Sequence, residues 1–187
     1  MTQRVYHKNM KIKTLIGLMV LIGLLSSVLI RSGKLLTIFS STKMKLTSPA
    51  LTEGGVIPEI YTCRGEDVSP PLVIVDPPAN TQSFALILED SDAPFQTWVH
   101  WVMWNISPET LVIIEDDIPL GATVGTTSAN DQKYNGPCPP TGTHHYAFKI
   151  VALDTTLTLP PEANKSDLET VIKGHVIGEA HLTGVFP

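Results

Sequence analysis

The stretch HHYAFKIVALD, residues 144–154, predicts a β-strand whose polar aromatic side chains precede an apolar run. The stretch LILEDSDAPFQTWVHWVMWNI, residues 86–106, has the same feature, with two aspartates and a histidine among very hydrophobic neighbours. Successive side chains of a strand point to opposite faces, so residues two apart share a face. This alternation places His144 and Tyr146 on one apolar face and turns His145 to the other.

The rest of the chain after residue 44 predicts a mostly β domain. Strong strands are expected at residues 82–90, 97–106 and 144–154, because they are rich in β-branched, aromatic and other apolar residues. Shorter strands are expected at residues 70–75 and 110–118. Fifteen prolines and thirteen glycines punctuate the sequence, which is typical of sheets joined by irregular loops.

One short helix is expected near the C-terminus. Ser166 followed by Glu169 matches a capping box, and Gly174 stands where a helix would end. The apolar stripe of this helix consists of Leu168, Val171 and Ile172. A second helical turn could follow at residues 175–182, although Gly178 weakens it.

Titratable side chains end an apolar face on each of the three strong strands. Asp90 and Asp92 continue the face of the first strand, and His144 begins that of the third. On the second strand, His100 is expected to share a face with Trp98, Val102 and Trp104. If these strands are neighbours, their ends form a small polar pit walled by aromatic side chains and proline, which is a usual form of a small-ligand site.

The residue types in this pit favour anion binding over catalysis. Ser91 points to the opposite face from Asp90, which argues against a serine nucleophile activated by a neighbouring base. A zinc site built from Asp90, His100 and His144 is chemically allowed as a less favoured alternative. Imidazole and backbone N–H groups can hold a phosphate or a carboxylate, and Gly142 allows close approach of the backbone before the third strand.

Charge divides the chain into two parts. Eight basic and no acidic residues precede Leu46, whereas five basic and all eighteen acidic residues follow, so the net charge changes from +8 to −13. An acidic domain with few lysines and arginines is a poor partner for nucleic acid and for an anionic bilayer. Any anionic ligand must therefore be held by a local site.

The basic N-terminal region, residues 1–43, contains a hydrophobic segment at residues 14–30. This segment has seventeen residues without a charge and is flanked by basic residues. We favour an uncleaved signal-anchor that attaches the protein to a membrane. A cleaved signal peptide, which would export the domain, and a cytoplasmic protein translated from Met44 are the alternatives. Cys63 and Cys138 are either free thiols or a disulfide, and their spacing is not of the zinc type.

Three ordered motifs carry a resemblance to a known family. DSDAP at residues 90–94, WVHW at 98–101 and GPCPPTGTHHY at 136–146 resemble the phosphatidylethanolamine-binding protein family, in the bacterial branch similar to Raf kinase inhibitor protein. The resemblance extends over residues 44–187 and includes YTCRGEDVSPPL at 61–72 and GHVIGEAHLTG at 174–184.

The resemblance implies a fold with a large central antiparallel sheet, a smaller second sheet and short helices. It implies an anion pocket without a cofactor, formed here by Asp90, Pro94, Trp98, His100, Pro137, Gly142, His144 and Tyr146. Ser91 and His145 depart from the proline and arginine common in the family, and the difference at His145 bears on ligand preference.

The sequence thus predicts a non-catalytic protein that binds a phosphate-like or carboxylate group. Asp90 is expected to orient a histidine or to accept from an ammonium group, while His100 and His144 donate to the anion. The alternative function is inhibition of a protein partner, a kinase or a protease, through the rim of the pocket. A metal-assisted hydrolase is the least favoured class.

Overall fold

The computed structural model describes residues 43–187, so the predicted hydrophobic segment at residues 14–30 lies outside the described part. The elements of this part are β1 (Lys45–Thr47), β2 (Gly55–Val56), the 3₁₀ helix η1 (Glu59–Tyr61), β3 (Leu72–Val75), β4 (Ser83–Asp90), β5 (Trp98–Ile106), β6 (Val112–Ile113), β7 (Thr123–Val124), β8 (His144–Leu153), α2 (Lys165–Val171) and β9 (Val176–Phe186). Within residues 43–187, no helix is long and apolar enough to cross a bilayer.

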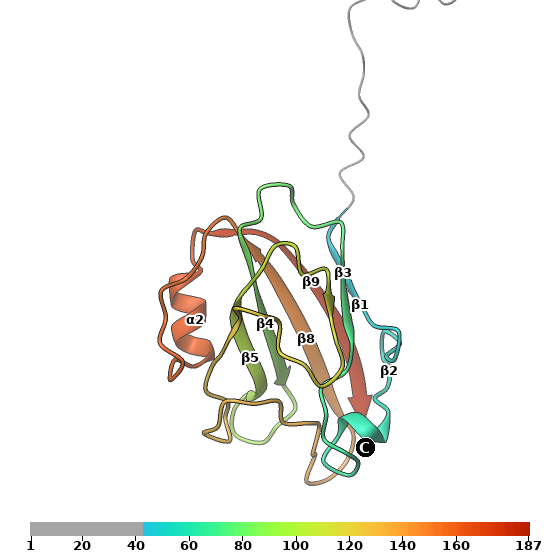
Figure 1. Cartoon of the computed structure of the whole chain (residues 1–187). Coiled ribbons are helices and arrows are strands. Elements are labelled where there is room, and N and C mark those ends of the chain that lie inside the picture. The colour runs from blue at the N-terminus through green and yellow to red at the C-terminus, as the bar shows by residue number, and fades with distance from the viewer. Residues whose placement is uncertain (1–42) are drawn as a thin grey trace, which may run out of the picture. The chain divides into compact units, whose positions relative to one another are not determined.

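Two sheets form the fold, and the prediction of a mostly β domain is confirmed. The large sheet has the strand order β2-β9-β8-β4-β5-β7, and the small sheet has the order β1-β3-β6. Neighbouring strands are antiparallel except for the short parallel pair of β2 and β9. The four long strands run side by side in Figure 1, with α2 at the left and β1 and β3 at the right.

Apolar side chains cover both faces of the large sheet. On one face, Leu86 belongs to a cluster that includes Ile74 of the small sheet. On the other face, Ile87 and Trp104 belong to a cluster that includes Leu168 of α2. A strand buried on both faces needs no polar alternation, which explains why β4 is almost continuously apolar.

The helix α2 is capped differently from the prediction. Asn164 is its N-cap, since its side chain accepts from the backbone N–H groups of Ser166 and Asp167. The Asp167 carboxylate accepts in turn from the backbone N–H of Asn164, which completes a capping box. The predicted box of Ser166 and Glu169 is therefore wrong. Gly174, expected at the helix end, has a φ of 85°.

Two other expectations for the C-terminal region are wrong. Val171, placed in the apolar stripe of the helix, is 38% exposed. Residues 175–182 form no helical turn, because Val176 begins β9, which pairs with β8 along almost its whole length. In β9, Ala180 and Leu182 are buried and His181 between them is exposed, which is the period of two that marks a strand.

Candidate functional site

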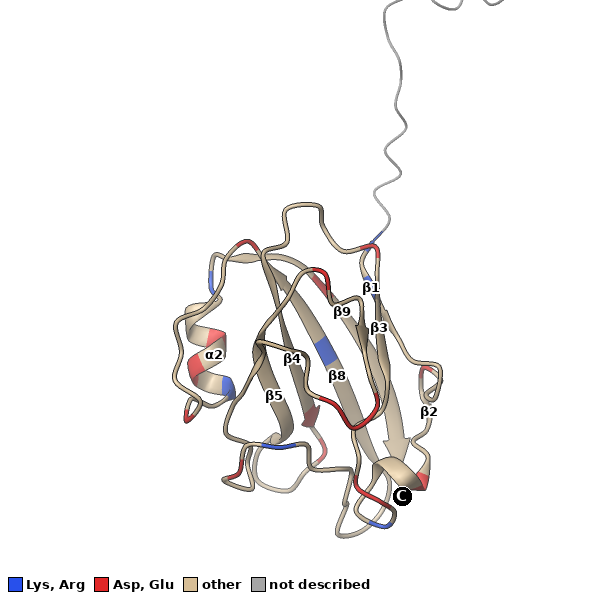
Figure 2. Cartoon of the chain, in the orientation of Figure 1, with Lys and Arg blue, Asp and Glu red and all other residues tan. Residues whose placement is uncertain are grey.

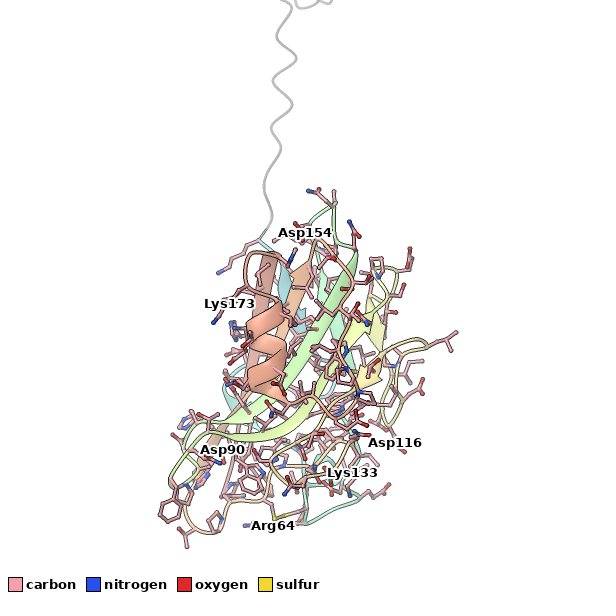
Figure 3. The ribbon with its side chains drawn as sticks, turned by 90° about the vertical axis from the view of Figure 1, so that its left-hand side faces the viewer. Arg64, Asp90, Asp116, Lys133, Asp154 and Lys173 are labelled. Carbon is pink, nitrogen blue, oxygen red and sulfur yellow. A yellow bond between two sulfur atoms is a disulfide. The ribbon has the colours of Figure 1, made fainter. Side chains whose placement is uncertain are left out.

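The strands β4, β5 and β8 bring their polar ends to one edge of the large sheet. Asp90 ends β4 and lies directly opposite Trp98 of β5 and Tyr146 of β8. Directly opposed residues point to the same face, so these three side chains are neighbours. In Figure 3, Asp90 lies toward the lower end of the molecule, whereas Asp154, which follows β8, lies at the upper end. The strand ends that the sequence indicated therefore meet.

A β-bulge in β5 sets the direction of His100. The ladder between β4 and β5 shifts at this residue, which has no directly opposed partner in β4. A bulge interrupts the strict alternation of side chains. His100 and Trp98 both line the cavity described below, but Val102 and Trp104 pack in the cluster that contains α2. The prediction that Val102 and Trp104 share the face of His100 is therefore wrong.

Asp92 lies beyond the end of β4 and belongs to an exposed pair with His145. Its Oδ2 accepts from the backbone N–H of His145 at 2.9 Å and from the ring Nδ1 at 2.6 Å. The hydrogen bond from the His145 side chain lowers the pKa of the Asp92 carboxyl. Asp92 does not line the cavity, so the prediction that it continues the face of Asp90 is wrong. His145 points away, as the alternation indicated.

A cavity of about 390 Å³ lies beside these strand ends. Five of the eight residues proposed from the sequence line it: Asp90, Pro94, Trp98, His100 and His144. Asp90, His100 and His144 are buried, whereas Trp98 is 39% exposed. A largely apolar hollow with a few fixed polar groups suits a small ligand.

The other three residues proposed from the sequence do not line the cavity. The Tyr146 ring packs edge-on against His100, with 5.3 Å between ring centroids. Pro137 is buried in the loop before β8, where its carbonyl accepts from the backbone N–H of Cys63 at 3.2 Å. Gly142 follows in the same loop with a φ of 77°, a left-handed conformation that glycine adopts without strain.

Protein acceptors orient both histidine rings of the cavity in the same way. Nδ1 of His100 lies 2.8 Å from the backbone carbonyl oxygen of Asn135, and a carbonyl can only accept, so Nδ1 donates. Nδ1 of His144 lies 2.7 Å from Oδ2 of Asp90, which accepts as a carboxylate. Asp90 uses its other oxygen to accept from the backbone N–H of Asp92 at 2.8 Å. In each ring, Nε2 is the nitrogen left to meet a ligand.

Burial shifts the pKa values of two side chains at this site. The pKa of His100 is lowered, chiefly because burial disfavours the imidazolium form, although hydrogen bonding and the charges of Asp90 and Asp67 oppose the shift. The pKa of Tyr146 is raised by burial and by the Asp90 charge. Its hydroxyl thus stays protonated, and it makes no hydrogen bond within residues 43–187.

Five of the other lining residues, which the sequence did not propose for the site, lie in two loops. The loop after η1 contributes Cys63 and Asp67, and the loop before β8 contributes Asn135, Gly136 and Cys138. A Cys63–Cys138 disulfide joins the loops, which decides between the alternatives left open by the sequence. Oδ1 of Asp67 also accepts from the backbone N–H of Gly136 at 2.6 Å. The YTCRGEDVSPPL motif contains both Cys63 and Asp67, but nothing in it indicated that Asp67 bonds to Gly136.

Gly136→Ala is expected to lower the free energy of unfolding by about 1–3 kcal/mol, because the loops meet too closely for a Cβ atom. That atom would lie 2.5 Å from the carbonyl oxygen of Tyr61 and 2.7 Å from Cα of Thr62. Urea unfolding measures the change. Gly142→Ala is the matched control, because its Cβ meets no atom within 4 Å and only backbone strain is added. Equal losses in both variants would contradict the close packing at Gly136.

The cavity does not assemble the zinc site considered from the sequence. Within residues 43–187, no group of three histidine, cysteine or carboxylate side chains is placed to hold a metal ion. Asp90 and His144 instead bond to each other, and His100 bonds to a backbone carbonyl.

Comparison with known sequences places these features in one family. The family model described as phosphatidylethanolamine-binding protein matches residues 47–187. A UPF0098 protein of Methanothermobacter thermautotrophicus is 43% identical over 148 residues, covering 76% of this chain and 98% of the relative. A UPF0098 protein of Aquifex aeolicus is 39% identical over 150 residues, covering 76% and 88%.

Solved structures agree with this assignment. The crystal structure of CT736 from Chlamydia trachomatis, described as a phosphatidylethanolamine-binding protein homolog, matches with a TM-score of 0.76 and 36% identity, over 79% of this chain and 99% of that one. The structure of YbcL from E. coli, described as a member of the mammalian PEBP family, matches with a TM-score of 0.73 and 27% identity, over 78% and 98%. The resemblance identified from the DSDAP, WVHW and GPCPPTGTHHY motifs is confirmed.

Proposed function

The chain belongs to the phosphatidylethanolamine-binding protein family, and from this premise we propose that its cavity binds a small phosphate-like or carboxylate group without transforming it. One observation carries the proposal. Both histidine rings of the cavity donate Nδ1–H to protein acceptors, so that Nε2 of His100 and Nε2 of His144 are available to one ligand. Two imidazoles oriented in this way can each contact the same oxyanion through Nε2.

Proton uptake provides the positive charge that an anion needs here. No lysine or arginine is among the described residues that line the cavity. A neutral imidazole with a proton on Nδ1 has only a lone pair on Nε2, and it becomes a donor there when it gains a second proton. The bound anion stabilises this cationic form, so we expect ligand and proton to bind together. The buried hydroxyl of Tyr146, whose ring packs beside His100, is a further donor nearby that has no partner among residues 43–187.

The lining supports binding rather than covalent catalysis. Serine, threonine and lysine are missing from the described lining residues, and both cysteines there form the disulfide. Ser91 does not line the cavity. A covalent mechanism needs an activated nucleophile next to a base, so the histidines are proposed to hold the ligand only.

Anion binding is expected to tighten as pH falls. Burial lowers the pKa of His100, so near neutral pH the free cavity lacks a proton that the complex holds. The complex then contains more protons than the free protein, and affinity rises by up to about tenfold per pH unit for each proton taken up between about pH 8 and about pH 6.5. The affinity stops rising once the pH drops below the pKa of His100 in the free protein.

Calorimetric titration with ethyl sulfate measures this effect, because sulfate esters do not titrate in this range. Repeating the titration in buffers of different ionisation enthalpy gives the number of protons taken up. Affinity that is independent of pH, together with no proton uptake, would rule out the role proposed for the two histidines.

Inhibition of a kinase or a protease through the cavity rim stays a prediction. Trp98 lines the cavity and is 39% exposed, and Phe95, which follows the lining residue Pro94 in the chain, is fully exposed with a backbone φ of 80°. Exposed aromatic side chains suit a protein contact, but they identify no partner.

A further inference from the structure

We propose that Asp67 selects among the anions that this cavity accepts, favouring groups with one negative charge over groups with two. The inference rests on the proposed function, since it concerns the ligand class of the same site. Singly charged groups of this kind include phosphate diesters, sulfate monoesters and carboxylates. Phosphate monoesters, which carry about −1.5 to −2 charge at neutral pH, would be disfavoured.

The position of Asp67 in the cavity wall is fixed by its loop. Its carboxylate accepts from the backbone N–H of Gly136 at 2.6 Å through Oδ1. Its backbone has a φ of 59°, a conformation that aspartate and asparagine tolerate better than most residues. The Cys63–Cys138 disulfide ties the same two loops together. Asp67 is therefore a fixed negative charge at the cavity.

Within residues 43–187, Asp67 forms no ion pair with a lysine or an arginine. Asp90 is paired with His144 at 2.7 Å. The nearest arginine along the chain, Arg64, has its guanidinium 4.8 Å above the ring of Phe186. Figure 2 shows how few lysines and arginines the described fold carries compared with aspartates and glutamates.

Electrostatics then distinguishes ligands by charge. If one proton enters with the ligand, a singly charged anion brings no net charge into the cavity, whereas a doubly charged anion brings −1. Repulsion between that extra charge and Asp67 across a partly desolvated cavity corresponds to about a tenfold loss of affinity. Without Asp67 this discrimination would largely disappear.

The test compares ethyl phosphate with ethyl sulfate, which have nearly the same shape but different charge, on the full chain at about pH 8. The variant Asp67→Asn keeps an acceptor for Gly136 N–H, tolerates the left-handed backbone and removes only the charge. We expect it to shift the ratio of the two dissociation constants about tenfold in favour of ethyl phosphate. The matched control is Asp76→Asn, at another left-handed aspartate that does not line the cavity, and its ratio should stay unchanged.

The outcomes separate the inference from the proposed function. If the wild-type protein binds neither ester, at this pH or at about pH 6.5, the proposed function is wrong and the inference falls with it. If both esters bind and Asp67→Asn leaves the ratio unchanged, the function stands and the inference is wrong. A shift of the same size in Asp76→Asn would also overturn it, because the effect would then follow net charge and not the cavity.

Discussion

Replacing His144 by asparagine is expected to weaken the binding of ethyl phosphate at least about thirtyfold, the loss that corresponds to a charge-assisted hydrogen bond of about 2 kcal/mol. The asparagine amide can take the place of Nδ1 and keep the bond to Asp90, which is 2.7 Å long in the native protein. The nitrogen proposed to contact the ligand, Nε2, is lost. Calorimetry at about pH 6.5 measures the affinity, because anion binding is expected to tighten as pH falls.

The control for this substitution is His145→Ala. His145 neighbours His144 in β8, but its side chain is 68% exposed and bonds to Asp92 outside the cavity. Its removal should change affinity by less than about threefold, as expected of an exposed pair. Equal losses for the two variants would contradict the assignment of His144 to the ligand, and an unchanged urea midpoint excludes unfolding as the cause.

Removing the disulfide is expected to lower the free energy of unfolding by about 4 kcal/mol. Cys63 and Cys138 are separated by 75 residues, so the bond strongly restricts the unfolded chain. The double variant Cys63→Ser, Cys138→Ser should therefore unfold at a much lower urea concentration than the wild type. The wild type measured with a dithiol reductant should behave like the double variant, and the double variant should not respond to the reductant. Identical midpoints for the oxidised wild type and the double variant would contradict the expectation.

The sequence predicted three long strands of the large sheet, β4, β5 and β8, because these strands are strongly hydrophobic. It misplaced Val102 and Trp104 because the bulge at His100 depends on how β5 pairs with β4, and no local pattern reveals this register. It missed β9, whose residues 176–182 contain too few large apolar side chains for their alternation to stand out. It misplaced the helix cap because Asn164 and Asp167 form a capping box two residues ahead of Ser166 and Glu169.

The candidate site was only partly predictable for a related reason. Strand alternation and the family motifs indicated Asp90, His100 and His144, which lie at strand ends. Asp67 and Asn135 act through contacts with residues far away in the chain, such as the bond from Asp67 to Gly136. Such long-range contacts between loops leave no periodic pattern in the sequence. The boundary of the N-terminal region and its membrane role stay predictions, since residues 1–42 lie outside the described part.

His100 and His144 are proposed to hold one anion through their Nε2 atoms. Nitrogen-15 NMR of the histidine side chains, recorded during titration with ethyl phosphate at about pH 6.5, tests this claim most directly. We expect the Nε2 signals of His100 and His144 to move together with one dissociation constant, while those of the exposed His175 and His181 stay in place. Unchanged signals of His100 and His144 at saturating ligand would contradict the claim.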